Sequence, residues 1–406
     1  MNKDNTVFTS EMKKTHTIYM PDMLHYHNEL LIAAFRYGGY KLAVVPEYER
    51  VPEDTFRFIN SAYCTCAMDI IGNIMAHITE PGVDLEHIAI LEPQAGGACR
   101  AGNYYDLIIQ CVKKSGHKIP VLSLNFRGEE SHPGFKINPK MLFGALAAVC
   151  YGDLLMSLYQ QIRPYEKNKG EADALYHKWV EKLSENISRG KNLFFKNKIY
   201  KRIVADFKNI PCYSKTEKKL TKAGVAGEIY IKCSPIGNRH LEDFLKNHDM
   251  DYRMEGFLNY CIYVVFTELK TAELNMASKA ELKAYNILIG RMIAMQNRIK
   301  KLLEKECFTA DGSFYEMKEK ANELLSEYYN IGDGWLVLAE VIDMLQQGYD
   351  KILIVHPFGC LVSHVAERGI LKKLRQMYPG ANINTIEYDY EQSETLRESR
   401  ILLALS

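Results

Sequence analysis

The chain has 406 residues, of which 47% are hydrophobic and 25% are charged, and its formal net charge is +1. This length exceeds one ordinary hydrophobic core and predicts two or three domains, and the near-zero charge excludes a general attraction to nucleic acid or to a membrane surface. Ten cysteines are spread along the chain, and residues 1–5 lead into polar sequence without the pattern of a signal peptide. We therefore expect a cytoplasmic protein whose cysteines are metal ligands or free thiols more often than disulfides.

The first third of the chain alternates short apolar strands with helices. Strands are expected at 17–21, 40–46, 88–91 and 119–124, and helices at 25–37, 64–78 and 104–113. This alternation predicts a parallel sheet that is covered on both faces. Ligands of such sheets bind beyond the carboxyl ends of the strands, so the loops that follow the strands are the first places to look for a site.

From residue 139 to about 220 the strand pattern is missing. Helices are expected at 142–159, 171–187 and 192–207. The longest apolar stretch, 141–159, is interrupted by Gly144, Gly152 and Asp153 and lacks basic flanks. We interpret it as a buried helix rather than a membrane span.

The last part of the chain returns to alternating strands and helices. Strands are expected at 227–232, 252–254, 351–355 and 382–388, and helices at 239–247, 258–329, 335–347 and 361–377. The predicted fold class is α/β, with two Rossmann-like parallel-sheet domains that face a cleft, a helical connector and helical insertions. The expected domains are an N-terminal α/β domain (1–138), a helical connector (139–222) and a C-terminal α/β domain with a helical insertion (223–406).

A glycine-rich turn over residues 94–105 follows an apolar run and precedes a helix. Gly96 and Gly97 allow the backbone to pass close to a bound group. The free N–H groups of the following helix favour a thiolate at Cys99, which a metal or an electrophile requires. The alternatives are an anion-binding turn and a small buried cysteine without a ligand.

Two further segments repeat this arrangement. Cys360 follows an apolar strand and a Pro/Gly turn, and Cys64 and Cys66 begin another helix. If the two domains face one another, these sulfurs meet in one metal site. Spacing alone leaves the matter open, because the chain has no Cys-x-x-Cys pair. Cys233, after the strand expected at 227–232, is a weaker candidate, and core packing is expected for the other cysteines, Cys111, Cys150, Cys212, Cys261 and Cys307.

Several motifs then occur in a characteristic order. They are Gly96-Gly97-Ala98-Cys99-Arg100-Ala101-Gly102-Asn103-Tyr104, Gly227-Glu228-Ile229-Tyr230-Ile231-Lys232, Gly332-Asp333-Gly334-Trp335, Pro357-Phe358-Gly359-Cys360, Pro379-Gly380-Ala381-Asn382 and Tyr388-Asp389-Tyr390. From about residue 8 to the C-terminus the chain resembles the 2-hydroxyacyl-CoA dehydratase-like proteins, and within them the branch related to acyl-CoA dehydratase activases. The resemblance implies an iron–sulfur cluster, 4Fe–4S or a double cubane, and electrons supplied by a separate ATP-hydrolysing activase.

The resemblance also bears on the ligand set, with Cys64, Cys99 and Cys360 as the ligands. In the family the helix-entry cysteine is followed by one residue and then by proline, whereas Cys66 occupies that proline position here. Cys66 is therefore either a fourth ligand or a substitution of the proline that has no effect on the cluster. The expected residues around the cluster are Gly96, Gly97, Arg100, Pro357, Phe358 and Gly359.

The ligand number decides between two functions. Three thiolates leave one iron open as a Lewis acid and electron conduit, and the resemblance then implies reduction of a 2-hydroxyacyl thioester and loss of hydroxide. Four thiolates close that position, and the chain is then an electron-transfer or accessory subunit that pairs with a catalytic homologue. A homodimer or a heterodimer with a homologous subunit is expected for the chain in general. A zinc or cluster-free scaffold is a third hypothesis. The chain has no Gly-x-x-x-x-Gly-Lys-Ser/Thr loop, so we expect it to need an ATP-hydrolysing partner.

Four polar residues have both a functional and a structural interpretation. Arg100 either offsets cluster charge or makes a surface ion pair. His356, like His364 nearby, either donates a hydrogen bond or carries a proton near the sulfurs, or is structural. Glu228 is a general acid or base if buried, or an ion-pair partner of Lys232 or of a nearby arginine. Asn238 is expected to cap the next helix.

Overall fold

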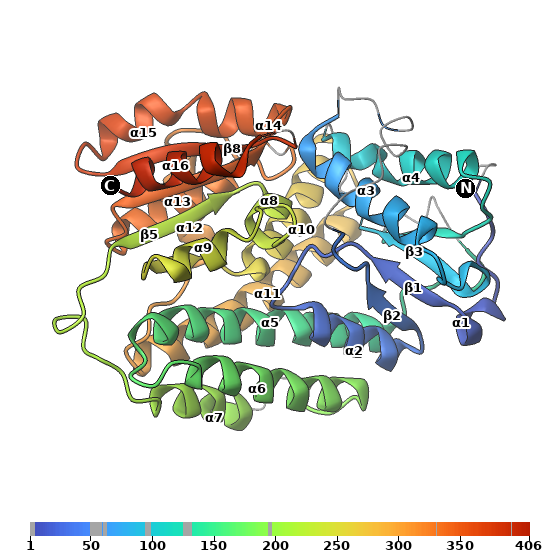
Figure 1. Ribbon diagram of the computed structural model, residues 1–406, viewed down its shortest axis with the longest axis horizontal. Helices are drawn as coiled ribbons and strands as arrows, with labels where there is room; N and C mark the ends of the chain where they lie inside the picture. Colours follow the sequence, from blue (N-terminus) through green and yellow to red (C-terminus); the bar gives the residue numbers. More distant parts are fainter. Residues whose placement is uncertain are drawn as a thin grey trace.

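The protein, described here from a computed structural model (Figure 1), is an α/β protein with two four-stranded sheets, each of them all-parallel. The structure describes residues 5–48, 59, 63–93, 99–124, 132–193, 197–329, 331–390 and 392–406. Figure 1 shows the two sheets in separate lobes, with long helices running beneath both. The predicted fold class, two Rossmann-like parallel-sheet units with many helices, is confirmed.

The N-terminal sheet has the strand order β2-β1-β3-β4. Its elements are α1 (Met12–Thr15), β1 (Thr17–Met20), α2 (Asn28–Gly38), β2 (Lys41–Val44), α3 (Thr65–Thr79), η2 (Leu85–His87), β3 (Ile88–Glu92), η3 (Arg100–Asn103), α4 (Tyr104–Lys114) and β4 (Val121–Ser123). Successive residues of β3 enter different clusters: Ile88 and Ile90 join the main core, while Ala89 and Leu91 pack with Phe35 of α2. Both faces of β3 are therefore buried, as expected for a parallel sheet.

The part of the chain between the two sheets is helical and includes one long apolar helix. Its helices are α5 (Pro139–Ile162), η4 (Arg163–Tyr165), α6 (Glu171–Ser188) and α7 (Asn197–Lys208). Pro139–Tyr165 is long and apolar enough to cross a membrane, but 78% of its most apolar window is buried inside the molecule. The residues that interrupt its apolar pattern lie at close contacts. A Cβ on Gly152 would lie 2.1 Å from the His27 ring, and Asp153 accepts hydrogen bonds at 2.8 Å from the N–H groups of Phe257 and Leu258.

The C-terminal sheet has the strand order β6-β5-β7-β8, with Gly224 of β5 opposite Ile352 of β7. Its elements are β5 (Lys222–Gly227), α8 (Ile229–Cys233), α9 (Leu241–Asn247), β6 (Asp251–Met254), α10 (Phe257–Leu274), α11 (Lys279–Lys305), α12 (Phe314–Asn322), α13 (Leu336–Gln346), β7 (Lys351–Pro357), α14 (Leu361–Ser363), η5 (His364–Arg368), α15 (Leu371–Met377), β8 (Asn382–Tyr388) and α16 (Glu394–Leu405). The long helical section predicted from 258 is the insertion α10–α12.

The strand predicted at 227–232 is wrong. The strand β5 ends at Gly227, and residues 229–233 form helix α8. Gly227 has φ +141°, which turns the chain, and the Glu228 carboxylate then accepts the Ile231 N–H at 2.9 Å as a helix cap. The apolar run looked like a strand because Ile229, Tyr230 and Ile231 are all buried in the short helix.

The single helix predicted at 361–377 is also wrong in detail. This segment divides into α14, a π-helical turn at His364–Arg368 (η5) and α15. A π-turn widens the helix by one residue per turn and is common beside functional sites. Here it lies directly after Cys360.

Candidate metal centre

Each of the three predicted ligands is the N-cap residue of a different helix. Cys64 precedes α3, Cys99 precedes the 3₁₀ turn that leads into α4, and Cys360 precedes α14. The prediction that these cysteines lie at helix N-termini is confirmed. The N–H groups at such ends point outward and favour negative charge, as a thiolate requires.

Backbone contacts join the loops of Cys64 and Cys360. The Thr65 N–H donates to the Phe358 carbonyl oxygen at 3.2 Å. Gly359 has φ +74°, and a Cβ on it would lie 3.6 Å from the Cα of Cys64. The beginning of α3 and α14 therefore lie side by side across the boundary between the lobes, as Figure 1 shows.

Side-chain interactions link Cys66 and Cys99 to the same region as Cys64 and Cys360. The Cys64 sulfur lies 2.7 Å from the Tyr104 hydroxyl, which belongs to the helix that follows Cys99. The Cys66 thiol donates to the Glu228 carboxylate across the lobe boundary at 3.3 Å. The charges of Glu228 and Cys64 both act on Cys99. The four cysteines thus share one electrostatic environment, drawn from both lobes.

The thiols of Cys64 and Cys66 differ in acidity. The neighbouring Cys66 side chain, followed by the hydrogen bond with Tyr104, lowers the pKa of Cys64 to about 6, although burial opposes the shift. Burial, followed by the neighbouring Cys64 side chain, raises the pKa of Cys66 well above its usual value. Cys64 is therefore the thiolate of the pair, and Cys66 keeps its proton.

The other two thiols are held neutral. Burial, reinforced by the charges of Asp333 and Glu228, raises the pKa of Cys99 to about 12. Burial and the charge of Glu228 also raise the pKa of Cys360. A cation that binds both sulfurs would remove this penalty, because metal coordination replaces the lost hydration of a thiolate.

These features match the donor chemistry of an iron–sulfur cluster. Thiolates are the usual ligands of such clusters, and hydrogen bonds to the sulfurs adjust their potential. The chain supplies three cysteines at helix N-termini and a buried hydroxyl, that of Tyr104, against one of them. Among the described residues no three His, Cys, Asp or Glu side chains are arranged as ligands of a single ion. The cysteines of a cluster bind separate irons, so their sulfurs need not meet at one point.

Glu228 does not pair with Lys232, in contrast to the structural alternative considered from the sequence. Lys232 instead makes a buried ion pair with Glu340 at 2.6 Å. Burial is the main cause of the raised pKa of Glu228, and the same cause raises the pKa of Asp333 to about 8. Asp333 also accepts the Ile229 N–H at 3.1 Å, so two acids flank the N-terminus of α8.

Of the remaining candidates, Arg100 lies at the surface and His356 lies in the core. Arg100 is exposed, and its charge lowers the pKa of Cys64 as a lesser cause. His356 is completely buried, and burial lowers its pKa to about 4, so it is neutral at pH 7. Its ring meets His364 edge-to-face at 5.8 Å, and the Nδ1 of His364 lies 2.6 Å from the Cys360 carbonyl oxygen.

The loop residues that the sequence predicts around the cluster lie in different places. Pro357 ends β7, and Phe358 is 48% exposed beside Cys360. Gly96 and Gly97 lie outside the described residues. Cys233 ends helix α8 rather than a strand, so the reason for considering it is wrong.

Two residues of the centre, Tyr104 and Asp333, are not among the site residues predicted from the sequence. Tyr104 lies in the same motif as Cys99, and Asp333 lies in Gly332-Asp333-Gly334-Trp335. The only sign in the sequence that these two residues belong to the site is that each is a polar side chain within one of the motifs. The Cys64 sulfur that Tyr104 contacts and the Ile229 N–H that Asp333 accepts lie 40 and 104 positions away in the chain.

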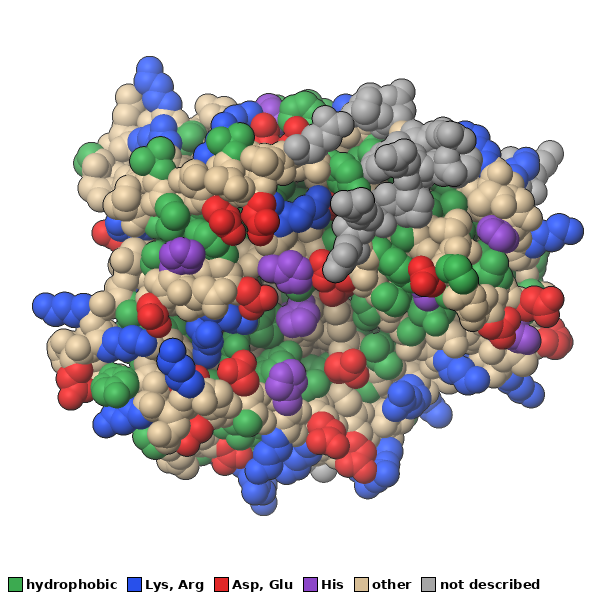
Figure 2. Space-filling model, in the orientation of Figure 1, with side chains coloured by type: hydrophobic (Ala, Val, Ile, Leu, Met, Phe, Trp, Pro, Cys, Tyr) green, Lys and Arg blue, Asp and Glu red, His purple; other side chains and the backbone are tan. Residues whose placement is uncertain are grey.

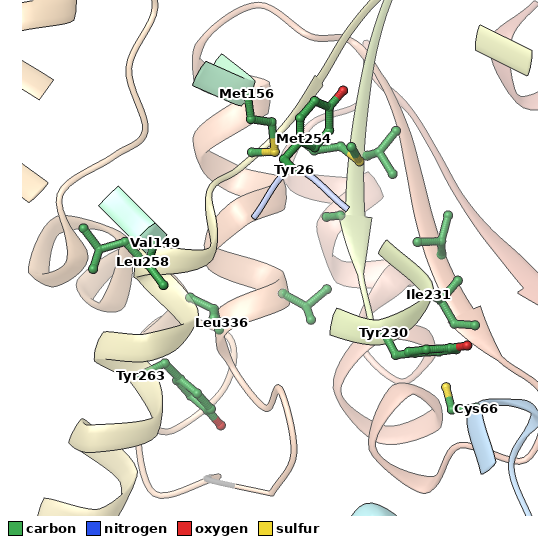
Figure 3. Close-up of a cluster of buried hydrophobic side chains, with 14 of the residues drawn as sticks. Tyr26, Cys66, Val149, Met156, Tyr230, Ile231, Met254, Leu258, Tyr263 and Leu336 are labelled. Atoms are coloured by element: carbon green, nitrogen blue, oxygen red, sulfur yellow. The ribbon is translucent and has the colours of Figure 1, made fainter. Parts of the chain in front are cut away.

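The lobe boundary beside the cysteines is closed by packing and ion pairs. In Figure 3, Cys66 of α3 lies next to Tyr230 of α8 within the buried hydrophobic cluster. Arg239 pairs with the buried Asp69 of α3 at 2.8 Å, and His240 pairs with Glu47 at 2.9 Å. Figure 2 shows histidine side chains along the middle of this face, over the boundary.

A small cavity also lies at this boundary. Its lining includes His25, His27, Cys233 and Glu255, and its volume is about 10 Å³. That is room for about one water molecule.

Comparison of the chain with protein-family models, with curated proteins and with solved structures gave no match. The fold and the candidate centre define the class of protein: a two-lobed parallel α/β protein with cysteines gathered between its lobes. The dehydratase-like resemblance stays a prediction.

Proposed function

We propose that this chain is an iron–sulfur protein related to 2-hydroxyacyl-CoA dehydratase components. It acts in ATP-coupled, low-potential electron transfer, reduction or dehydration together with a separate activase. The observation that carries the proposal is the meeting of cysteine N-caps from both lobes, with the Cys64 and Cys360 loops joined through Thr65 and Phe358. A bound cluster would supply one-electron redox chemistry, with Lewis acidity if one iron stays open.

The chain's own residues have separate roles in this proposal. Cys64, Cys99 and Cys360 would hold the cluster, and Cys66 is retained as a possible fourth ligand to be tested. In its present contact Cys66 is a protonated thiol that donates to Glu228. The Oε2 atom of Glu228 accepts hydrogen bonds from the Cys66 thiol and from the Ile231 N–H, and this carboxyl group would lie next to the cluster.

Access for an electron donor supports the role of a partner. Phe358 and Leu361, on either side of Cys360, are 48% and 59% exposed. The centre therefore comes close to the surface at α14. An activase-type protein that carries low-potential electrons is the partner proposed for this surface.

A specific observation favours the second candidate function, an electron-transfer or accessory subunit without its own substrate. The boundary is held by the Thr65–Phe358 hydrogen bond and the Arg239–Asp69 ion pair, and one cavity at it, beside His27 and Cys233, has a volume of about 10 Å³, which is far smaller than an acyl-CoA. Turnover of a 2-hydroxyacyl-CoA with an activase and reductant would decide for the catalytic function.

The first prediction concerns iron content. Anaerobic reconstitution with iron and sulfide should give a brown wild-type protein, and Cys64→Ala, Cys99→Ala and Cys360→Ala should each lose most of the bound iron. Cys307→Ala is the matched control, because Cys307 is exposed, and it should bind iron like the wild type. Iron and acid-labile sulfide per chain are the measurements.

Two results would revise the proposal. A wild-type protein that binds no iron and sulfide under anaerobic conditions would remove the iron–sulfur function. Unchanged iron in Cys66→Ala would remove Cys66 from the ligand set and leave it as the hydrogen-bond partner of Glu228.

A further inference from the structure

The small cavity at the lobe boundary is lined by a buried carboxyl group that has no cation beside it among the described residues. Glu255, which follows the last residue of β6, lines this cavity and is 1% exposed. Its Oε2 atom accepts a hydrogen bond from the Asn259 side-chain amide at 3.2 Å, whereas its Oε1 atom has no hydrogen-bond partner in the part of the chain that the structure describes. A buried carboxylate is costly without a partner, so this group must hold either a proton or a cation.

The other buried acids whose charges act on Glu255 are each paired with a cation. The pairs have distances of 2.6–3.7 Å and are Asp311 with Arg253, Glu340 with Lys232, and Asp343 with Lys320. No such pair is found for Glu255 among the described side chains. Burial, followed by the charges of these three acids, raises the pKa of Glu255 well above its usual value. A cation in the cavity would offset both effects.

A second polar group of the cavity is oriented by a hydrogen bond from outside it. The Nε2 atom of His27 lies 2.8 Å from the Oδ1 atom of Asp153, and Asp153 also accepts two backbone N–H groups at the start of α10. A carboxylate that accepts in this way fixes the proton of the ring on Nε2, and the Nδ1 atom of the neutral ring is then an acceptor. His27 and Glu255 thus both offer acceptor atoms to an occupant of the cavity.

The rest of the lining and the size of the cavity also suit a small cation. Tyr26 and Phe257 contribute aromatic rings, and Met156 and Met254 contribute thioether groups; Figure 3 shows Tyr26 and the two methionines side by side. Aromatic faces attract cations, and thioether sulfurs accept weak hydrogen bonds. The cavity volume of about 10 Å³ admits one particle of the size of a water molecule, and ammonium and potassium ions are close to that size.

We propose that this cavity binds a monovalent cation of the size of a water molecule, with Glu255 as its counter-charge and ammonium as the ion that the lining fits best. Ammonium donates hydrogen bonds to carboxylate and imidazole acceptors and is attracted to aromatic faces, whereas potassium supplies charge alone. This inference does not depend on the proposed iron–sulfur function, and its test needs no activity.

The experiment measures urea unfolding of the purified protein over about two orders of magnitude in ammonium chloride concentration. Tetramethylammonium chloride keeps the ionic strength constant, because its cation is too large for the cavity. Once the site is filled, each tenfold rise in ammonium should lower the unfolding equilibrium constant about tenfold, which corresponds to one ion released per unfolded chain. Potassium chloride should act in the same direction at higher concentration.

Two variants locate the ion, and a third is the matched control. Glu255→Gln keeps the shape of the side chain and removes its charge, so the dependence on ammonium should vanish. Cys233→Leu fills the cavity without changing the carboxyl group and should have the same effect, which keeps the test open if Glu255→Gln does not fold. Glu92→Gln removes another carboxyl group that is 1% exposed and has an unpartnered oxygen, but Glu92 ends β3 and does not line the cavity, so this variant should respond to ammonium like the wild type.

Each outcome decides the proposal. A response to ammonium in the wild type and Glu92→Gln that is lost in Glu255→Gln and Cys233→Leu supports the site. Equal wild-type stability in ammonium, potassium and tetramethylammonium chloride would overturn it and show that Glu255 keeps a proton. An undiminished response in folded Glu255→Gln would also overturn it, because the ion would then bind elsewhere.

Discussion

Single residues in this protein owe their chemistry to burial more than to neighbouring charges. Glu92, at the carboxyl end of β3, is 1% exposed, and burial alone raises its pKa to about 8. Its Oε2 atom has no hydrogen-bond partner among the described residues. An isolated carboxyl group in such a place keeps its proton, because a buried charge without a partner is costly.

This burial predicts a pH dependence of stability. The folded pKa of Glu92, about 8, lies above the ordinary value of 4.5, so the folded state holds a proton that the unfolded state releases. The stabilisation is complete below pH 4.5 and is lost as the pH rises through about 8. Glu92→Gln should therefore remove part of the decline in the free energy of unfolding with rising pH. For one proton this decline is at most about 1.4 kcal/mol per pH unit.

The measurement is the free energy of unfolding from urea titrations at pH 5.5 and pH 7.5. Glu11→Gln is the control, because Glu11 is exposed and backbone and side-chain hydrogen bonds lower its pKa. Titration of Glu11 therefore affects the free energy of unfolding only at pH values below 4.5. A wild-type protein and a Glu92→Gln variant with parallel pH profiles would show that Glu92 is ionised or partnered in the folded state.

At the scale of single elements, glycines decide where the strands and helices of the site end. Gly227 ends β5 with φ +141°, and a Cβ on it would lie 1.9 Å from the Val355 carbonyl oxygen of β7. This close approach lets β5 stop and turn, so that Glu228 begins α8 and faces Cys66. Gly290, in the middle of α11, has open space around it.

The two glycines predict opposite effects of alanine. Gly227→Ala should lower the free energy of unfolding by about 3 kcal/mol or more, because a backbone atom of the neighbouring strand must move. Gly290→Ala should raise it by about 1 kcal/mol, because alanine restricts the unfolded chain and favours the helix. Urea unfolding of the two variants tests both effects, and equal effects would contradict the packing described around Gly227.

At the scale of the whole molecule, the two lobes are joined by one continuous hydrophobic core and by ion pairs of very different burial. The Arg239–Asp69 pair has side chains 26% and 3% exposed, whereas those of His240 and Glu47 are 49% and 47% exposed. Arg239 and His240 both have left-handed backbone, with φ +53° and +58°. Only the first pair leaves a buried carboxylate when it is broken.

This difference predicts unequal costs of substitution. Arg239→Gln should destabilise the protein by about 2 kcal/mol, because Asp69 loses the cation that offsets its burial. His240→Gln, with the same new side chain at a similar backbone angle, should cost about 0–1 kcal/mol, as is usual for exposed pairs. Thermal and urea unfolding are the measurements, and a His240 variant as unstable as the Arg239 variant would show that backbone strain, not the buried charge, dominates this loop.

The sequence by itself determined the fold class and the position of the key cysteines on it. Apolar runs such as 88–91 and 351–355 predict buried parallel strands, and cysteines after such runs predict helix N-termini, because both features depend on residues close in the chain. The same local reasoning failed at 227–232, where a fully buried short helix and a buried strand are equally apolar. Periodicity cannot separate the two in so short a segment.

Only the tertiary structure decided which groups meet. The contacts of Cys64 with Tyr104, of Cys66 with Glu228 and of Lys232 with Glu340 span 40, 162 and 108 positions. Nothing in the local sequence fixes such pairings, since they depend on how two lobes pack against each other. The acidity of each cysteine follows from those same contacts and from burial, and so it too belongs to the folded molecule rather than to the motif.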